Sequence, residues 1–217
     1  QCISVCPTAA LTGVGYIQET WAAIFDKKKT VVVQVAPAVR VAIGEEFGLP
    51  AGQDVTGRLV AGLRHIGFNA VFDTTFGADL TIIEEGKEII ERIESNQHLP
   101  ILTSCCPGWI NFLNYHFPNL NYMASTCKSP QQMTGAIIKT YYANKMGIAP
   151  EDIIVVSVMP CIAKKYEALL PGEETYGIRD VDLVITTREL AKMFKEGSID
   201  LRHIQEEEFD SPLGQSS

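Results

Sequence analysis

The run Thr30-Val31-Val32-Val33-Gln34-Val35, followed by Ala36-Pro37, decides how this chain folds. It is β-branched at almost every position and therefore has no polar face to turn toward water. Such a run is typical of a strand that is buried on both faces in a parallel sheet. We therefore predict a central strand over residues 30–35.

Further runs of the same kind follow along the chain, at residues 69–73, 101–104, 153–159 and 181–186. Helical patterns alternate with them, at residues 39–47, 55–66, 80–93, 109–117, 131–145 and 189–194. This alternation predicts an α/β fold in which a parallel sheet is flanked by helices on both faces.

Several helix boundaries can be predicted from single residues. Ser129 before Pro130, with Gln132 three positions after the serine, combines an N-cap, a first-turn proline and a capping-box acceptor. Gly147 is expected to end the same helix, and Thr187 to cap the last one.

The predicted strand ends at 36–37, 73–75, 103–107 and 159–161 should open onto one carboxyl edge, where α/β proteins hold ligands. Two of these ends carry thiols, in Thr103-Ser104-Cys105-Cys106-Pro107-Gly108-Trp109 and Met159-Pro160-Cys161-Ile162-Ala163-Lys164-Lys165-Tyr166-Glu167. Thiolates suit soft metal clusters, and cysteines from different strand ends can converge on one. We expect the two motifs to share a cleft.

The N-terminal residues carry a third cysteine pattern. Cys2 and Cys6, followed by Pro7, match the second half of the bacterial ferredoxin run C-x2-C-x2-C-x3-C-P. The Cys2 and Cys6 spacing alone is also compatible with a chance occurrence or with a structural pair of cysteines. Residues 13–29 are interpreted as a linking segment whose charge run, 26–29, is a solvated turn.

The composition excludes several classes of protein. With 217 residues and 46% hydrophobic content the chain should be globular, and a charge of -8 argues against a nucleic-acid surface. No apolar stretch approaches the roughly 20 residues of a membrane helix. We predict a cytoplasmic protein with reduced thiols, although six cysteines could form disulfides. Cys127 is interpreted as a small buried hydrophobe.

The two cysteine motifs, in this order and behind a ferredoxin-like segment, closely resemble the first two signature motifs of the [FeFe]-hydrogenase catalytic domain. Segments 34–40, 73–79, 181–182 and 186–189 match as well. The resemblance divides the chain into the tail of a ferredoxin-like 2[4Fe-4S] domain (1–12), the linking segment (13–29) and a partial catalytic domain (30–217).

The resemblance implies an oxidoreductase that reversibly forms H2 from protons and electrons at an H-cluster. In that group, a [4Fe-4S] cubane is joined through one thiolate to a di-iron unit with CO, cyanide and a dithiolate bridge. Accessory [4Fe-4S] clusters, ferredoxin as redox partner and dedicated hydrogenase maturases are implied too.

Site residues follow from the same resemblance. Cys106 and Cys161 would bind the cubane, Cys2 and Cys6 an accessory cluster, and Cys105 would carry protons to and from the bridging amine.

Other residues would surround the cofactor. Lys164 would donate hydrogen bonds to an anionic cyanide, and Ala36, Pro37 and Met159 would form an apolar wall. Gln131 is a further candidate for the pocket.

A buried proton site also needs a path to water. Glu85, Glu88 and Arg92 have the i, i+3, i+7 spacing of one helical face, which taken alone favours a solvated acidic face. The resemblance instead implies a relay from Cys105 through Glu85, Ser125 and Glu88 to Arg92.

The third motif of the resemblance, a glycine-rich stretch with two more cysteines, has no counterpart in these residues. The chain alone is therefore expected to be inactive. We expect a fragment of a longer gene product, in preference to a natural chain whose C-terminal half is a separate polypeptide. The alternatives are a hydrogenase-like protein of iron-sulfur cluster assembly and an H2 sensor; Cys105, Lys164 and the glutamate pattern favour the enzyme.

Overall fold

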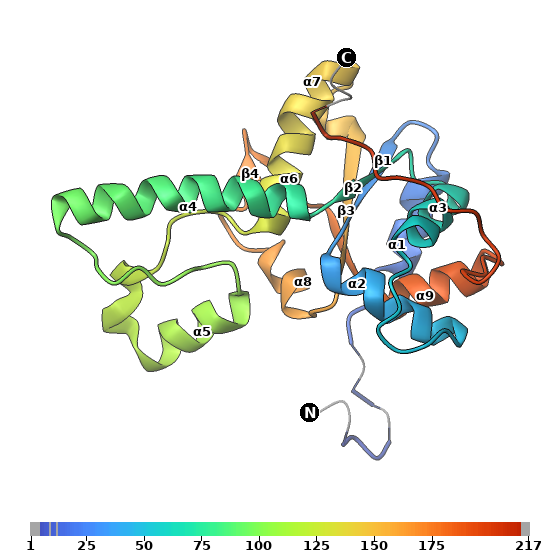
Figure 1. Ribbon diagram of the computed structural model, residues 1–217, viewed down its shortest axis with the longest axis horizontal. Helices are drawn as coiled ribbons and strands as arrows, with labels where there is room; N and C mark the ends of the chain where they lie inside the picture. The colour runs from blue at the N-terminus through green and yellow to red at the C-terminus, as the bar shows by residue number, and fades with distance from the viewer. Residues whose placement is uncertain (1–4, 9, 12, 214–217) are drawn as a thin grey trace.

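The computed structural model describes residues 5–8, 10–11 and 13–213, and its centre is a parallel four-stranded sheet (Figure 1). The strand order is β2-β1-β3-β6, where β1 is Thr30–Val35, β2 Ala70–Asp73, β3 Ile153–Met159 and β6 Leu183–Thr186. The chain adds β2 on one side of β1 and β3 on the other. The carboxyl ends of β1 and β3 therefore form the switch point at which α/β sheets bind ligands.

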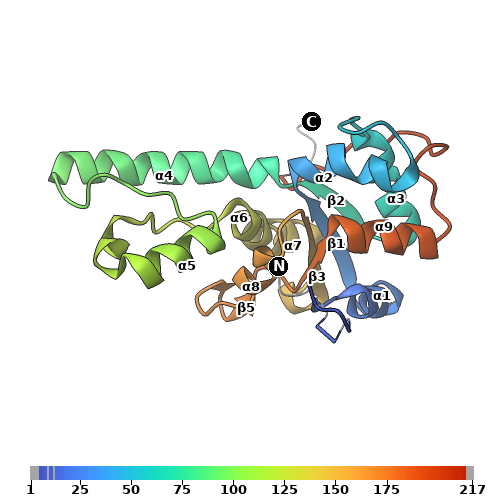
Figure 2. The ribbon, with the colours of Figure 1, turned by 90° about the horizontal axis from the view of Figure 1, so that it is seen from below.

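Helices cover both faces of this sheet, which confirms the predicted fold class (Figure 2). Helices α6 and α7 lie on one side, and α1, α3 and α9 lie on the other. The helix bounds are α1 Ile17–Phe25, α2 Pro37–Ala42, α3 Thr56–Ile66, α4 Thr75–Ser95, α5 Pro107–His116, α6 Pro130–Ile137, α7 Ala143–Met146, α8 Ala163–Glu167 and α9 Thr187–Glu196.

Shorter elements complete the chain. A π-helical turn, Ile138–Tyr142, joins α6 to α7, and a two-stranded hairpin joins β4 (Glu174–Thr175) to β5 (Ile178–Arg179). The 3-10 turns are Ile43–Phe47, Pro118–Met123 and Pro150–Asp152.

Strand β1 is the core of the sheet because it pairs on both edges. Val33 is opposite Val71 of β2 and Val156 of β3, and all three side chains are fully buried. The one amide in the strand, Gln34, is satisfied: Thr74 donates to its Oε1 and its Nε2 donates to the Gln131 carbonyl. The buried amide thus ties the strand to the beginnings of α4 and α6.

The predicted strand over 101–104 is wrong. Leu102 forms only an isolated bridge with Ala124, outside the central sheet. Both edges of β1 are already occupied, and Pro100 cannot donate a ladder hydrogen bond at the start of the run. The segment belongs instead to an arm of α4, α5 and the residues between them, which projects from the sheet (Figure 1).

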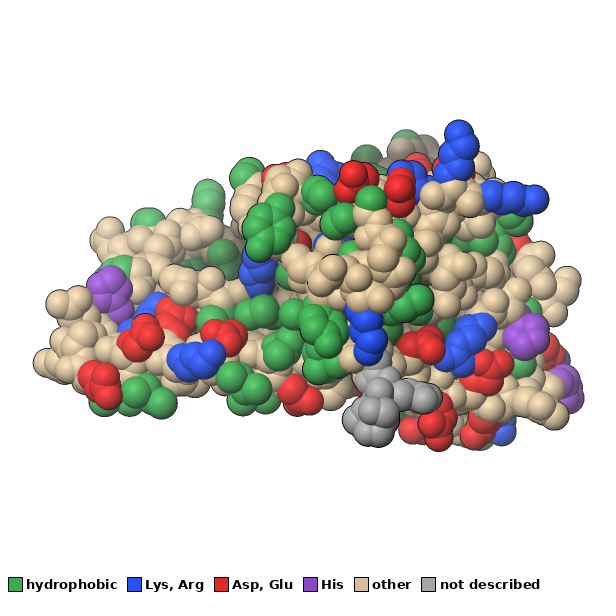
Figure 3. Space-filling model, turned by 90° about the horizontal axis from the view of Figure 1, so that it is seen from above, with side chains coloured by type: hydrophobic (Ala, Val, Ile, Leu, Met, Phe, Trp, Pro, Cys, Tyr) green, Lys and Arg blue, Asp and Glu red, His purple; other side chains and the backbone are tan. Residues whose placement is uncertain are grey.

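Helix α4 buries two of its charged side chains and exposes several of its apolar ones. Glu88 and Arg92 are nearly buried, whereas isoleucines on another face of the helix are exposed: Ile82, Ile83, Ile89, Ile90 and Ile93. Figure 3 shows hydrophobic side chains among charged ones on the surface of the arm. A surface helix normally has the opposite pattern, and an exposed apolar stripe is typical of an interaction surface.

Two of the predicted helix boundaries need correction. Ser129 does cap α6 and Gly147 does end α7. The side chain of Gln132, however, is buried without a hydrogen-bond partner, so the capping box is only half formed. Helix α9 is capped by Thr186 rather than Thr187, because Glu189 three residues after Thr186 completes a capping box with it.

The segment expected to link two domains contains α1, whose residues Ile17, Trp21 and Ile24 pack against the core. Residues 26–29 form the predicted turn. Within the described part of the chain, no helix combines the length and apolar character needed to cross a membrane.

Gly77 provides a test of how the arm is attached. A Cβ at this position would overlap Thr134 Oγ1 and the Pro130 carbonyl oxygen, because α4 lies against α6 there. We predict that Gly77→Ala lowers the free energy of unfolding by about 1–3 kcal/mol in urea denaturation.

Gly86→Ala is the matched control, since a Cβ on this glycine of the same helix meets nothing within 4 Å. It should stabilise the chain by about 0.5–1 kcal/mol. Equal effects of the two substitutions would contradict close contact between α4 and α6.

Candidate cofactor site

A cavity of about 440 Å³ opens at the switch point of the sheet. Most of the pocket residues that the sequence predicts line it: Ala36, Pro37, Cys105, Gln131, Met159, Cys161 and Lys164. Its remaining lining residues are mostly small or apolar: Ala38, Thr74, Thr75, Ala78, Pro130 and Pro160. The structure therefore brings residues that are distant in sequence to one apolar pocket.

Pairing of the two central strands places the first wall of this cavity. Val35 is opposite Val158, and the Ala36 N–H donates to the Val158 carbonyl at 3.1 Å. Ala36, which follows β1, and Met159, which ends β3, are both buried. Pro37 begins α2 and Cys161 follows β3, so both stand at the rim and are exposed.

Cys105 reaches the same cavity by a route that differs from the prediction. It lies on the arm, at the end of a segment that does not join the sheet. Lys164 Nζ donates to the Cys105 carbonyl at 2.8 Å, which ties the first cysteine motif to the second. The shared cleft is present, although one of its thiols does not come from a strand end.

The polar groups of the pocket suit a metal cofactor with polar ligands. Gln131 Oε1 is buried without a hydrogen-bond partner, while its Nε2 donates to the Lys164 carbonyl at 3.3 Å. Two exposed thiols and one ammonium group complete the polar set. Soft thiols, an ammonium donor and an apolar wall fit an iron-sulfur group with anionic ligands, and the orphaned acceptor fits an N–H carried by the same group.

The predicted iron ligands do not all meet. Cys106 is outside this lining and caps α5, where its Sγ accepts the Trp109 N–H at 3.4 Å. Cys6 lies on the N-terminal segment, and a backbone hydrogen bond at Leu11, followed by hydrogen bonds from Thr8, lowers the pKa of its thiol to about 7. Cys2 lies outside the described residues. Among the described residues, no three His, Cys, Asp or Glu side chains are grouped to hold a metal.

Three of the predicted relay residues form one cluster. Ser125 Oγ donates to Glu88 Oε2 at 2.8 Å, and Arg92 Nη2 pairs with Glu88 Oε1 at 2.5 Å. Arg92 also donates to the carbonyls of His98, Met123 and Ala124. Glu88 and Arg92 are therefore anchored in the arm, and the solvated face that their spacing favours is wrong for them.

Glu85, the other predicted relay residue, is half-buried and has no hydrogen-bond partner among the described residues. It lies one turn before Glu88 on α4. The structure thus shows contacts at the outer part of the predicted relay, and none between Cys105 and Glu85.

Cys127 and Thr126 contact Glu88 and were missed as members of this cluster. The Thr126 N–H donates to the Glu88 carboxylate at 3.2 Å, and Cys127 Sγ lies 3.7 Å from Glu88 Oε2. Cys127 is only partly buried, and burial raises the pKa of its thiol. No local pattern indicates these contacts, because the two segments are separated by more than thirty residues.

The electrostatics of Glu88 follow from these contacts. Burial disfavours its charge, but hydrogen bonds from Ser125, Thr126 and Arg92 outweigh burial and lower the pKa of Glu88. Because this pKa is lower in the folded state, the stabilisation is complete above the unfolded pKa of about 4.3 and disappears as the pH falls through the folded value.

Glu88→Gln should therefore lower the free energy of unfolding by about 2 kcal/mol at pH 7, as measured by urea denaturation. Its difference from the wild type should shrink when the measurement is repeated below pH 4. Glu91→Gln, an exposed glutamate on the same helix, is the control and should change stability by less than about 0.5 kcal/mol. A difference for Glu88→Gln that is independent of pH would contradict the charged cluster.

Comparisons with known proteins assign the chain to a family. The family described as iron-only hydrogenase large subunit, C-terminal domain, matches residues 29–217. The NADP-reducing hydrogenase subunit HndD of Solidesulfovibrio fructosivorans is 53% identical over 223 residues, which cover 100% of this chain and 38% of that protein. This chain thus spans less than half of that relative.

A solved [FeFe]-hydrogenase, determined in a study of stepwise H-cluster assembly, is 47% identical with a TM-score of 0.87, and the match covers 94% of this chain and 52% of that one. A cytosolic Fe-S cluster assembly factor of Danio rerio is 36% identical over 192 residues, covering 85% of this chain and 46% of that factor. With this match in sequence and fold, the chain belongs to the iron-only hydrogenase large-subunit family.

Proposed function

We propose that this chain forms part of an [FeFe]-hydrogenase that reversibly reduces protons to H2 at an H-cluster. One observation carries the proposal: Cys105, Cys161 and Lys164 meet at a single apolar cavity at the switch point of the sheet. Family membership supports the same reading. When bound, the H-cluster would supply the iron site at which protons and electrons combine.

The chain's own residues would hold this group. Cys106 and Cys161 would provide thiolates to its cubane. Ala36, Pro37 and Met159 would exclude water from the di-iron unit, because they form an apolar wall at the strand ends.

Two polar side chains would orient the group. Lys164 Nζ would donate a charge-assisted hydrogen bond to an anionic ligand, and the unpaired Oε1 of Gln131 would accept a hydrogen bond from the bridging amine. Neither role requires movement of the strands.

Protons would enter and leave through the cysteine next to the first ligand. The Cys105 thiol is a suitable carrier, because a thiol exchanges protons with an amine of similar pKa. From Cys105 the proton would pass to Glu85 on α4, then through the Ser125 hydroxyl to Glu88 on the same helix. Arg92 would hold Glu88 in place through its ion pair.

The ligand set in this proposal is incomplete. Only Cys106 and Cys161 are assigned to the cubane, which in this cofactor needs four thiolates. The remaining ligands would come from polypeptide beyond these 217 residues, and the 217 residues alone should not turn over H2. The match to about half of the solved hydrogenase chain supports this division.

Electrons would arrive through accessory [4Fe-4S] clusters, one of them bound by Cys2 and Cys6. We propose ferredoxin as the redox partner. The competing route is electron delivery from a partner subunit, and the relationship to an NADP-reducing hydrogenase subunit supports that route. Dedicated maturases are supported by the relative studied for H-cluster assembly. A cytoplasmic location stays a prediction.

The alternative is a hydrogenase-like protein that acts in cluster assembly or as an H2 sensor. The relationship to a cluster assembly factor keeps the first of these open at lower identity. Cys105 and Lys164, which both line the cavity, favour hydrogen chemistry. Cluster assembly requires neither a proton carrier nor a side chain that donates a hydrogen bond to cyanide.

Infrared spectroscopy separates these functions. We predict that the complete protein, after maturation, shows bands of iron-bound CO and cyanide. Protein produced without the maturases is the control and should lack these bands. Their absence from maturated protein would favour the assembly function, and bands without H2 evolution from reduced ferredoxin would favour the sensor.

The proton route predicts a loss of turnover with an intact cofactor. Cys105→Ala and Glu85→Gln, each in the complete enzyme, should lower H2 evolution by about 100-fold or more, because a positioned acid or base contributes that much. Their CO and cyanide bands should persist. Glu91→Gln on the exposed side of α4 is the matched control. Unchanged turnover in either relay variant would refute the route.

A further inference from the structure

Glu167, the last residue of the second cysteine motif, has no role in the function proposed above. It is 4% exposed, on the last position of α8. Ser129 Oγ donates to its Oε1, and Lys164 Nζ lies 2.5 Å from its Oε2. Each carboxylate oxygen of Glu167 therefore has its own partner, one of which is the lysine of the cofactor cavity.

The hydrogen bonds of Lys164 can be counted. An ammonium group has three N–H donors. One points to Glu167 and a second to the Cys105 carbonyl at 2.8 Å, and the described residues offer no acceptor for the third. Because the group is tetrahedral, two fixed donors also fix the direction of the third. Lys164 lines the cofactor cavity, where a bound ligand can accept from this donor.

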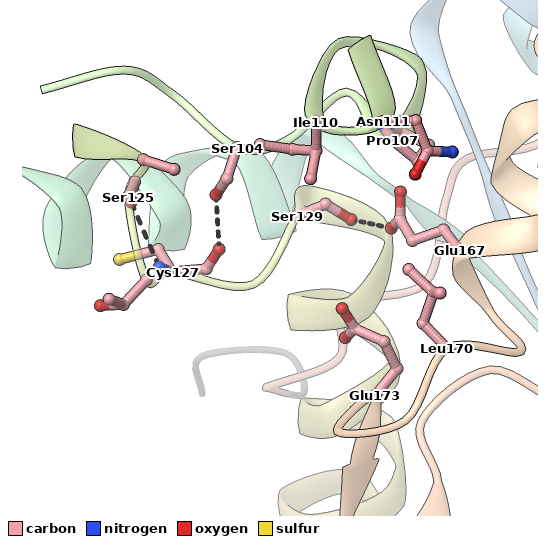
Figure 4. A pocket seen from close by; sticks show the side chains of 12 residues that line it. Ser104, Pro107, Ile110, Asn111, Ser125, Cys127, Ser129, Glu167, Leu170 and Glu173 are labelled. Carbon is pink, nitrogen blue, oxygen red and sulfur yellow. Dashed lines mark hydrogen bonds between the residues drawn. The ribbon is translucent and has the colours of Figure 1, made fainter. Parts of the chain in front are cut away.

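Glu167 also belongs to a second, smaller cavity of about 270 Å³. Figure 4 shows its carboxylate bonded to Ser129, in a wall that also includes Ser104 and Asn111. Lys164 lines one cavity and Glu167 the other, so their ion pair lies between the two. Ser129, the N-cap of α6, thus holds the glutamate of this pair from the side away from the cofactor cavity.

We propose that Glu167, with Ser129 behind it, is a positioning residue that aims the Lys164 ammonium at the cofactor. Glu167 acts through Lys164 and does not itself touch the reacting atoms. This inference rests on the proposed function, because it assumes that an anionic ligand of the cofactor accepts the third N–H. It assigns to Ser129 a second task besides capping α6.

The neighbouring lysine provides a comparison within the same helix. Lys165 pairs with Glu189 at 2.8 Å, and the two side chains are about as buried as those of Lys164 and Glu167. That pair joins α8 to α9 and the segment before α1, and it lies outside the cofactor cavity. Glu189→Gln therefore removes a similar ion pair without changing the pocket, and glutamine can still serve in the capping box.

The first test measures the ammonium group directly, without the cofactor. In the full chain labelled with 15N-lysine, hydrogen exchange at Lys164 Nζ is followed by NMR, with Lys164→Met identifying the signal. Glu167→Gln should accelerate exchange by about tenfold or more, because a charge-assisted hydrogen bond is lost. Ser129→Ala should give a smaller acceleration, and Glu189→Gln should give none.

Exchange that is equally slow in the wild type, Glu167→Gln and Ser129→Ala would overturn the positioning role. Should Glu167→Gln fail to fold, Ser129→Ala decides the question, because it leaves the ion pair and removes only the hydroxyl. Unchanged exchange in that variant would equally contradict the proposal.

The second test uses the complete, maturated hydrogenase. Glu167→Gln should shift the cyanide infrared bands and lower turnover by about 10- to 100-fold, which is typical of residues that orient a ligand's partner. Glu189→Gln should leave the bands in place. Unshifted cyanide bands in Glu167→Gln would overturn the inference. A wild type without cyanide bands would contradict the proposed function instead, while the exchange experiment would still test the hold of Glu167 on Lys164.

Discussion

The parallel pairing of β1 with β3 is the constraint on which the rest of this structure depends. Val35 faces Val158, and the Ala36 N–H extends the ladder by one more bond to Val158. Since β2 lies on the other side of β1, the connections that leave the carboxyl ends of β1 and β3 diverge to opposite sides, and an opening remains above these strand ends. The two adjacent ends carry Ala36-Pro37 and Met159-Pro160-Cys161, so sheet topology alone places an apolar wall beside a thiol.

The arm completes the site by a different kind of interaction. Its strand-like segment makes no ladder with the sheet, and Cys105 is held through its carbonyl by Lys164. Behind it, Glu88 and Arg92 are buried together, which is costly unless each charge is paired and hydrogen-bonded. Arg92 meets that condition with three backbone carbonyls. The polar inner face of α4 therefore organises the arm, while its isoleucines are left on the surface.

Much of this arrangement is readable from the sequence, and the exceptions have physical reasons. Runs of β-branched residues indicate buried strands, so the bounds of β1, β3 and β6 can be predicted to within two residues. Periodicity cannot say which sheet a run joins, and residues 101–104 were therefore misplaced. Spacing on α4 suggested a solvated face, because the partners of Glu88 arrive from a segment 37–39 residues away. The pairing of Glu167 with Ser129 is invisible for the same reason.

In the function proposed above, two cysteine motifs, one from the sheet and one from the arm, serve a single iron cofactor. Anomalous diffraction at the iron edge from crystals of the complete, maturated protein tests it most directly. We expect iron density inside the cavity lined by Cys105, Cys161 and Lys164, continuous with density at Cys106. Ordered iron elsewhere in the protein, with this cavity empty, would contradict it.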